Sequence, residues 1–384
     1  MLKCPVIYFG KGAYARVGTL KGKRALIVTD EKIAELGFVR EAQERLQKAG
    51  IQSRVFDKVE PEPKDSTAYN CADVATDFKP DWIIGLGGGS PMDVAKGAFF
   101  LYERPDVSLP QINPFQVYGL RKKAQLAEVP TTSGTGSEVS IGIALTDTDS
   151  GKKLALTCFE LVPDIAIVDP ELAFKMPPQL RATTGIDALT HAIESYLTKM
   201  SSVFTNPIAI EAIQTVFKFL EKSFLEGDEE AMERMHYGAT LAGIAMSNSG
   251  LGIAHGVGHT IGAFFHVPHG QAVGVTLPYA IQYCSKQSKD RYLDILRALE
   301  VKGATSTNST QKLLSEIKEL MSKVQMPTTL EGLGINKQEF RDKIPALASF
   351  AAADVSTFTS SRMPTTEQMK TILDYMIEGK PIDF

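Results

Sequence analysis

Cysteines are few in this 384-residue chain, and their placement limits what they can do. Cys4, Cys71, Cys158 and Cys284 lie far apart and form no CxxC pair. We therefore expect neither a disulfide framework nor a thiolate zinc site, and a reducing cytoplasm suits the composition. No basic segment followed by an apolar run opens the chain, since MLKCPVIYFGKG soon turns polar. A cytoplasmic protein is expected.

An excess of charge of one sign is also missing. The chain has 41 Lys and Arg against 45 Asp and Glu, a formal net charge of -4, which gives no electrostatic reason to expect nucleic acid. Between Arg234 and Lys286 there is no charged residue, but polar residues, glycines and histidines interrupt the apolar sequence. A membrane span needs about twenty predominantly apolar residues. We predict a buried helical core around a polar site and no membrane partner.

Internal repeats and low-complexity segments are absent as well, and the length suits two domains. In residues 1–177, runs rich in Ile and Val alternate with amphipathic segments, in the order ALIVTD, the helix-like EKIAELGFVREAQERLQKAG, SRVFDKV and DWIIGLGGGS. With LAEVP and DIAIVDP as further strands, this order predicts a largely parallel α/β sheet covered by helices. After Met176-Pro177-Pro178 longer helical periods take over, so residues 178–384 are predicted to form an all-α domain.

The segment IIGLGGGSPMDVAKG ends a predicted strand in glycines and then opens a helix. Ser90 is expected as the N-cap, with Pro91 at the first helical position and Asp93 at the third, which by itself is a capping box. Capping does not require the three glycines 87–89, which let a phosphate approach free backbone N–H groups. We favour pyrophosphate binding, although Ser90 stands where the last glycine of a GxGxxG motif belongs.

A second loop, PTTSGTGSEVS, gathers hydroxyls and glycines after a short strand. It is either a flexible solvated loop or, together with the first glycine loop, a second wall of donors for ribose or phosphate. Asp30, which ends ALIVTD, supplies a carboxylate for ribose hydroxyls. A carboxylate at this place would repel a 2′-phosphate and so favours NAD over NADP.

Histidine is rare too, yet four of the six histidines fall within GIAHGVGHTIGAFFHVPHG. Asp187 and His191 are four residues apart in TTGIDALTHAIESYL and share one helix face, as do His255 and His259. An Asp–His pair alone is most often a surface ion pair. Together with the histidine-rich stretch, in which His269 sits in a Pro-His-Gly turn, one carboxylate and three imidazoles make a sphere suited to Fe(II), Zn or Ni.

The motifs GGGSPMDVAK, PTTSGTGSE, DPEL followed by MPP, GIDALTHAIE and AHGVGHTIGAFFHVPHG resemble the iron-containing (group III) alcohol dehydrogenase family over nearly the whole chain. The resemblance implies a Rossmann-like nucleotide domain and a helical domain, the dehydroquinate synthase-like fold, with the cofactor and a divalent metal meeting in the cleft between them. The metal ligands that it implies are Asp187, His191, His255 and His269. Around the dinucleotide it places Asp30, Gly88, Gly89, Ser90, Asp93, Thr131, Thr132 and Lys153. It further implies Fe(II), with Zn as the alternative, and a homodimer or larger homo-oligomer. The family's C-terminal NPR is replaced by Ser360-Ser361-Arg362.

The expected reaction is hydride transfer between a small primary alcohol or diol and NAD, because a divalent cation lowers the pKa of a bound hydroxyl. His259 is expected to relay a proton or contact the substrate, against the alternative of a packing role. His266 is expected in a loop, and His236 in a structural role. The competing hypotheses are a relative on the same fold (glycerol dehydrogenase-like, hydroxy-acid dehydrogenase or dehydroquinate synthase-like) and a non-catalytic nucleotide- or metal-binding protein.

Overall fold

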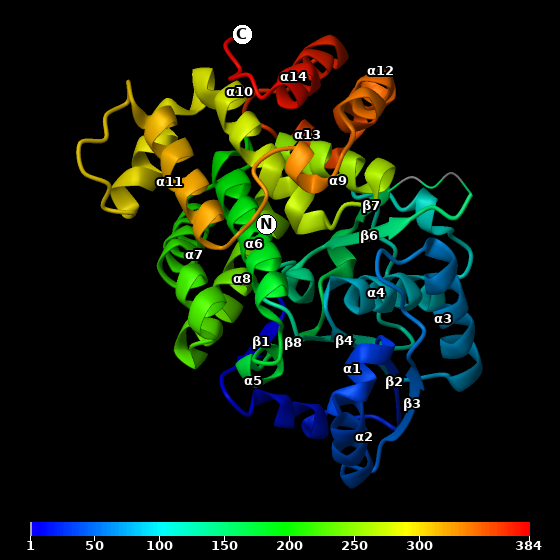
Figure 1. The fold of residues 1–384 in the computed structure, drawn as a ribbon. Coiled ribbons are helices and arrows are strands. Elements are labelled where there is room, and N and C mark those ends of the chain that lie inside the picture. The colour runs from blue at the N-terminus through cyan, green and yellow to red at the C-terminus, as the bar shows by residue number, and fades with distance from the viewer. Residues whose placement is uncertain (1, 150, 152) are drawn as a thin grey trace. The chain divides into compact units, whose positions relative to one another are not determined.

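The computed structural model describes residues 2–149, 151 and 153–384, and its contacts separate a unit that ends at Met176 from one that begins at Pro177 (Figure 1). In chain order the first unit consists of β1 (Val6–Phe9), η1 (Ala13–Thr19), β2 (Arg24–Val28), α1 (Glu31–Glu35), α2 (Phe38–Lys48), β3 (Gln52–Phe56), α3 (Asp65–Phe78), β4 (Trp82–Gly87), α4 (Gly89–Glu103), η2 (Leu109–Gln111), β5 (Gln125–Pro130), η3 (Ser137–Val139), β6 (Gly142–Thr146), β7 (Lys153–Thr157), η4 (Phe159–Leu161), β8 (Ile165–Val168) and α5 (Pro170–Ala173).

Six of these strands form one parallel sheet in the order β1-β8-β5-β4-β2-β3, which confirms the predicted α/β sheet. The chain runs from β2 outward to β3 and then returns past β2 to β4. The winding direction therefore changes between β2 and β4, the kind of place where such sheets bind ligands at the carboxyl ends of their strands. Two features were not predicted, the edge strand β1 and the antiparallel hairpin of β6 and β7.

Helices cover both faces of the sheet because successive side chains of a buried strand point to opposite sides. On β2, Ala25 and Ile27 belong to a buried cluster that includes residues of α2. Leu26 and Val28 belong to a different cluster, built with α3 and α4. All four side chains are fully buried, as expected for a strand between two layers of helices.

Two helix boundaries differ from the expected ones, and glycine is the reason at both. The segment expected to continue as one helix after Asp30 is broken at Gly37, whose φ of +88° ends α1 and opens α2. The predicted N-cap of α4 was also wrong, because the helix begins at Gly89 with Gly88 as N-cap. Gly87 takes a φ of +151°, which turns the chain into the helix before Ser90 is reached.

The second unit consists of α6 (Pro178–Leu197), α7 (Asn206–Glu226), α8 (Glu229–Ser249), α9 (Ile253–Phe265), α10 (His269–Ala298), α11 (Ser309–Lys323), η5 (Glu331–Leu333), α12 (Lys337–Ala353), α13 (Val355–Phe358) and α14 (Thr366–Glu378). No strand is assigned among these described residues, which confirms the predicted helical region. Its buried apolar side chains form a single cluster to which most of these helices contribute. None of the described helices is long and apolar enough to cross a bilayer.

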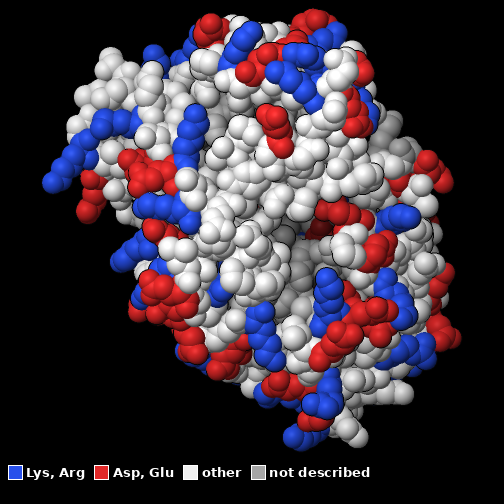
Figure 2. Space-filling model, viewed as in Figure 1, with Lys and Arg blue, Asp and Glu red and all other residues white. Residues whose placement is uncertain are grey.

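Charge is mixed on the face of the molecule that Figure 2 shows. Lys and Arg side chains alternate with Asp and Glu side chains, and neither sign gathers into a broad patch on this face. This distribution agrees with the nearly balanced composition of the chain, and it offers no basic stripe that would follow a nucleic acid backbone on this face.

Candidate metal centre

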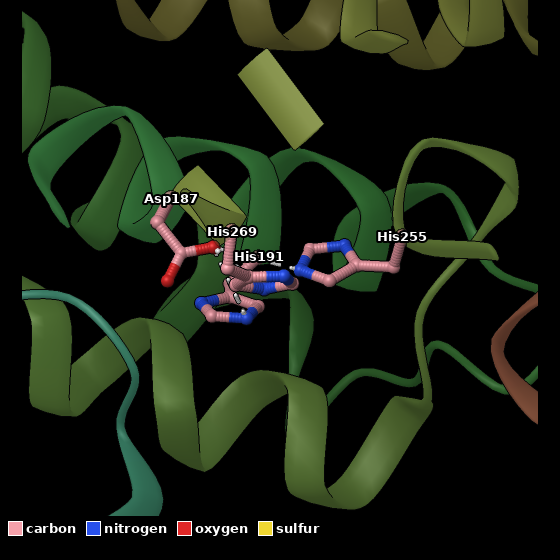
Figure 3. Close-up of side chains that lie close together, drawn as sticks. All are labelled: Asp187, His191, His255 and His269. Carbon is pink, nitrogen blue, oxygen red and sulfur yellow. Dashed lines mark ion pairs between the residues drawn. The ribbon is translucent and has the colours of Figure 1, made fainter. Parts of the chain in front are cut away.

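The four expected ligands converge in the second unit, as Figure 3 shows. Asp187 and His191 come from α6, His255 from α9, and His269 is the first residue of α10. Each offers one ligand atom, and these atoms all lie within 4.8 Å of one another. From Asp187 Oδ1 to the Nε2 atoms, the distances are 3.4 Å for His269, 3.7 Å for His255 and 3.8 Å for His191.

These distances fit a shared cation better than they fit direct hydrogen bonds. A hydrogen bond between such atoms would be about 2.7–3.2 Å long, whereas ligands about 2.1 Å from one ion lie about 3.4 Å apart in a tetrahedral site. Asp187 Oδ1 and His255 Nε2 are buried without a hydrogen-bond partner among the described residues. One carboxylate with three imidazoles suits a divalent transition metal, so the residues present fit the expected ion.

The carboxyl group of Asp187 is held in its charged form. Burial alone would raise its pKa, but the rings of His191, His269 and His255 outweigh burial and hold that pKa well below its usual range. A metal ligand must be deprotonated, so this side chain is ready to bind a cation over the whole neutral pH range.

Glycines let the helices approach closely enough to bring these ligands together. A Cβ atom on Gly258 would lie 2.5 Å from Val273 Cγ1 of α10, and one on Gly256 would lie 2.1 Å from Thr357 Oγ1 of α13. Similarly, a Cβ on Gly270 would lie 2.3 Å from the backbone oxygen of Thr183 in α6. Gly256 and Gly258 therefore remove bulk between the histidines of α9. The turn expected at His269 is the first turn of a helix instead, with Pro268 as its N-cap.

His255 has a partner that the sequence analysis did not find. Its Nδ1 lies 2.7 Å from Oε2 of Glu194, a residue of α6. Burial would lower the pKa of His255, but its contacts with Asp187 and Glu194 outweigh this and raise it to about 9. A signal was present in GIDALTHAIE, because Glu194 follows Asp187 by seven residues and His191 by three and so lies on their face of the helix.

His259 lies beside the four ligands and is not one of them. Its ring is stacked on that of His269 with centroids 5.2 Å apart, and its Nδ1 lies 3.0 Å from Oδ2 of Asp354. Burial lowers the pKa of His259, which Asp354 opposes. Burial in turn would raise the pKa of Asp354, but His259 and the N–H of Ser356 outweigh it, and that pKa falls to about 2.

The two other histidines lie outside this group. His266 is exposed and forms the C-cap of α9 with a φ of +54°, which agrees with its expected place in a loop. His236 is buried in α8, where burial lowers its pKa to about 4.

Most of the residues expected around a dinucleotide lie at one edge of the parallel sheet in the first unit. Asp30 follows β2, the glycine loop follows β4, and Thr131 and Thr132 follow β5, so all of them are at carboxyl ends of neighbouring strands. The second loop packs on the first: the Thr131 N–H donates to the Gly87 oxygen, and a Cβ on Gly88 would lie 3.4 Å from Thr132 Cγ2.

Asp93 and Lys153 have partners of their own within this unit. Both carboxylate oxygens of Asp93 accept hydrogen bonds, from Ser137 Oγ at 2.7 Å and from the Ala144 N–H at 2.9 Å. Lys153 on β7 forms an ion pair with Glu62.

Lys96 was missed by the sequence analysis, although it stands three residues after Asp93 in GGGSPMDVAKG. Its Nζ is fully buried and donates to oxygens of Ser137, Ser140 and Gly142. With Asp93 it fixes the end of the second loop and the start of β6.

Comparison with known proteins gives the same family for both units. Residues 4–170 match the family described as iron-containing alcohol dehydrogenase, and residues 181–377 match the C-terminal part of that family. The NADPH-dependent butanol dehydrogenase of Clostridium saccharobutylicum is 42% identical over 380 residues, which cover 98% of each protein. Lactaldehyde reductase of Escherichia coli is 33% identical over 94% of this chain and 95% of its own length.

Solved structures agree with these sequence matches. A crystal structure of 1,3-propanediol oxidoreductase superimposes with a TM-score of 0.91 and 30% identity, covering 98% of this chain and 99% of that one. The matches extend over nearly the full length of both proteins in each pair. The chain therefore belongs to the iron-containing alcohol dehydrogenase family, oxidoreductases that interconvert alcohols and aldehydes.

Proposed function

We propose that the protein interconverts small primary alcohols or diols and their aldehydes, with NAD as the hydride carrier and Fe(II), or alternatively Zn, as the metal. The observation that carries this proposal is the group of four ligand atoms around Asp187 Oδ1, which is buried and has no hydrogen-bond partner among the described residues. The names of the relatives support small substrates, because butanol, lactaldehyde and 1,3-propanediol are short alcohols, diols or aldehydes.

Asp187, His191, His255 and His269 would hold the metal. When bound, the metal would polarise the substrate oxygen, and the dinucleotide would take up or return the hydride. Asp187 contributes a negative charge that favours a divalent cation, and the three rings contribute neutral nitrogen donors. No thiolate takes part, which favours Fe(II) or Zn in a catalytic site over a structural zinc.

The dinucleotide would lie at the carboxyl edge of the parallel sheet. The N-terminus of α4 presents the backbone N–H groups of Gly89 and Ser90 after Gly88, and such an N-terminus attracts a pyrophosphate. Thr131 and Thr132 supply hydroxyls next to this loop. We propose that Asp93 and Lys153 belong to the same site, with Asp93 keeping the second loop in place through Ser137.

NAD is proposed over NADP because of Asp30. This side chain follows β2, next to the strand that carries the glycine loop, where an acid accepts ribose hydroxyls and repels a 2′-phosphate. The butanol dehydrogenase relative uses NADPH according to its name, so a competition between NAD and NADP is an informative test for this chain.

We propose His259 as the residue that accepts or returns the proton of the substrate hydroxyl. If Asp354 accepts a hydrogen bond from Nδ1–H of His259, the Nε2 atom is left as the proton acceptor. The ring lies next to that of His269, one of the residues that would hold the metal, which supports this role.

We further propose a cytoplasmic homodimer or larger homo-oligomer, as the family resemblance implies. Sedimentation equilibrium of the purified chain at several concentrations would give the molar mass in solution. A monomer at all concentrations would contradict this part of the proposal.

The test of the proposed function is anaerobic reconstitution. Protein stripped of metal with a chelator is reloaded separately with Fe(II) and with Zn, and formation of NADH is followed with a panel of small primary alcohols and diols. Turnover that depends on the metal is the expected result, and the panel ranks the substrates. If neither metal supports turnover of any alcohol or aldehyde with NAD or NADP, the proposal fails.

A further inference from the structure

One face of α6 carries a third acidic or basic side chain in addition to the two proposed ligands. Asp187, His191 and Glu194 follow each other at intervals of four and three residues, which places them in one row along the helix. Glu194 is 5% exposed. A carboxylate this deeply buried requires several hydrogen bonds, because an uncompensated buried charge is costly.

The hydrogen bonds that the Glu194 carboxylate accepts from the described residues come from the start of α9. Oε2 accepts from the Gly252 N–H at 3.0 Å, and Oε1 accepts from the Ala254 N–H at 2.6 Å. The His255 N–H is a third backbone donor, at 3.3 Å. The N-cap of α9 is Gly252, which has no side chain with which to satisfy these donors. Glu194 thus caps α9 from a different helix.

The same carboxylate also fixes which nitrogen of His255 faces the proposed metal. Its Oε2 lies 2.7 Å from Nδ1 of His255, and a carboxylate oxygen is an acceptor, so in this arrangement the ring donates its Nδ1–H. The ring nitrogen that remains is Nε2, which lies 3.7 Å from Asp187 Oδ1. A carboxylate behind a ligating imidazole sets its tautomer and makes it a stronger donor.

Glycine at position 252 is a condition for this arrangement. A Cβ atom on Gly252 would lie 2.6 Å from Oε1 and 3.0 Å from Cδ of Glu194. The φ of Gly252 is −143°, in the extended region, so the backbone itself does not demand glycine. Any side chain here would instead push the carboxylate away from His255.

We propose that Glu194 is a positioning residue for the metal centre: by capping α9 and accepting from Nδ1 of His255 with one carboxylate, it couples the docking of α9 to metal affinity. The proposal rests on the proposed metal-dependent function, because it takes His255 as a ligand. Glu194 contacts neither substrate nor cofactor in this proposal. Gly252 contributes by leaving room for the Glu194 carboxylate.

The experiment measures the affinity of the full-length, metal-free protein for Zn²⁺ by competition with a chromophoric chelator. The variants are Glu194→Gln and Gly252→Ala. The matched control is Asp228→Ala, since Asp228 caps α8 through the Ala231 N–H and is not in the group of metal-ligand candidates found among the described residues. Urea unfolding of each metal-free protein reports the stability effect of losing a cap separately from the metal.

We expect Glu194→Gln to weaken Zn²⁺ binding by about 10- to 100-fold, as for other residues behind a metal ligand. An amide has only one accepting oxygen, so when that oxygen takes the place of Oε2 beside Nδ1 of His255, the NH₂ group faces the Ala254 N–H, and one donor opposes another. Gly252→Ala should weaken binding in the same direction with Glu194 intact. Asp228→Ala should lower the stability of the metal-free protein and leave Zn²⁺ affinity unchanged.

Zn²⁺ affinity of Glu194→Gln equal to that of the wild type would overturn the proposal. If this variant does not fold, Gly252→Ala decides: weaker binding supports the coupling, and wild-type affinity refutes it. A wild-type protein that binds no Zn²⁺ would instead defeat the proposed metal centre itself, so the two failures are distinguishable.

Discussion

Each unit buries a polar cluster, and the two clusters differ in how their atoms are satisfied. In the first unit, Lys96 Nζ, with three N–H donors, lies 2.5–3.1 Å from five oxygens of Ser137, Ser140 and Gly142. In the second unit, Asp187 Oδ1 lies 3.4–3.8 Å from Nε2 of the three histidines and accepts no hydrogen bond from the described residues. A polar cluster whose hydrogen bonds are completed within the protein has a structural role. A cluster whose lone pairs converge without donors is suited to bind a ligand or a metal ion.

The largest effect is expected where an external ion completes the cluster. His255→Ala should lose metal and activity together, with turnover falling about 10³-fold, because a Lewis acid contributes several kcal/mol to the transition state. Metal content by mass spectrometry and the rate of NADH formation measure the two losses. His266→Ala is the control, because His266 is exposed at the end of the same helix. Full metal occupancy in His255→Ala would remove His255 from the ligand set.

A substitution in the Lys96 cluster should lower the stability of the protein and leave its metal binding unchanged. Lys96→Met would orphan the oxygens of Ser137, Ser140 and Gly142, so we expect the free energy of unfolding to fall by about 3–5 kcal/mol. Urea unfolding measures this change. Lys58→Met, at an exposed ion pair with Glu31, is the matched control and should leave stability unchanged. A folded Lys96→Met protein that had lost its zinc affinity would break the contrast between the two clusters.

Glu128 on β5 is the exception within the first unit. Both of its carboxylate oxygens are buried without a hydrogen-bond partner among the described residues. Gly85 on the neighbouring strand makes room for it, since a Cβ there would lie 2.0 Å from Oε2. Burial raises the pKa of Glu128 well above its ordinary 4.5, which Lys96 opposes. The Glu128 carboxylate, which lacks hydrogen-bond partners among the described residues, thus lies near the Lys96 ammonium, which has them. The candidate metal ligands found among the described residues are all in the second unit.

The pH dependence of stability should reveal this exception. Because the folded pKa of Glu128 is raised, its contribution to stability is fully present below pH 4.5 and is lost as the pH rises towards the folded pKa. Glu128→Gln has no such proton to lose, so it should be more stable than the wild type by about 1–3 kcal/mol at neutral pH. Urea unfolding at several pH values measures the difference, and a difference that does not grow with pH would contradict the raised pKa.

Features set by short spacings were predictable from the sequence. Helical spacing puts Asp187 and His191 on one face, and alternating apolar runs indicate strands such as β2 and β4. Features that join distant segments were not predictable. Glu194 meets His255 across 61 residues and Asp354 meets His259 across 95. The spacing in GIDALTHAIE puts Glu194 on the face of the proposed ligands, but it does not identify His255 as its partner. For the same reason the edge strand β1, which pairs with β8, was missed.

The start of α4 was misplaced for a different physical reason. A hydroxyl followed by an acid three residues later is a reliable sign of a helix start when the backbone before it is ordinary. Here the consecutive glycines permit a conformation that other residues rarely adopt, and Gly87 uses it. The acid at Asp93 is then free to bind Ser137 and Ala144 instead of capping the helix.

The smallest expected effect concerns Asp30, an acid of the first unit that is only partly buried. Its Oδ1 accepts from the Ile33 N–H at 2.9 Å and so caps α1, which gives it a structural role beside the proposed one. Asp30→Asn keeps an oxygen for the cap and removes the charge, whereas Asp30→Gly removes both. If the charge selects the cofactor, both variants should lower the ratio of kcat/KM for NAD over NADP about tenfold, or about 1.4 kcal/mol. An unchanged ratio in Asp30→Asn would show that Asp30 caps α1 and does not select the cofactor.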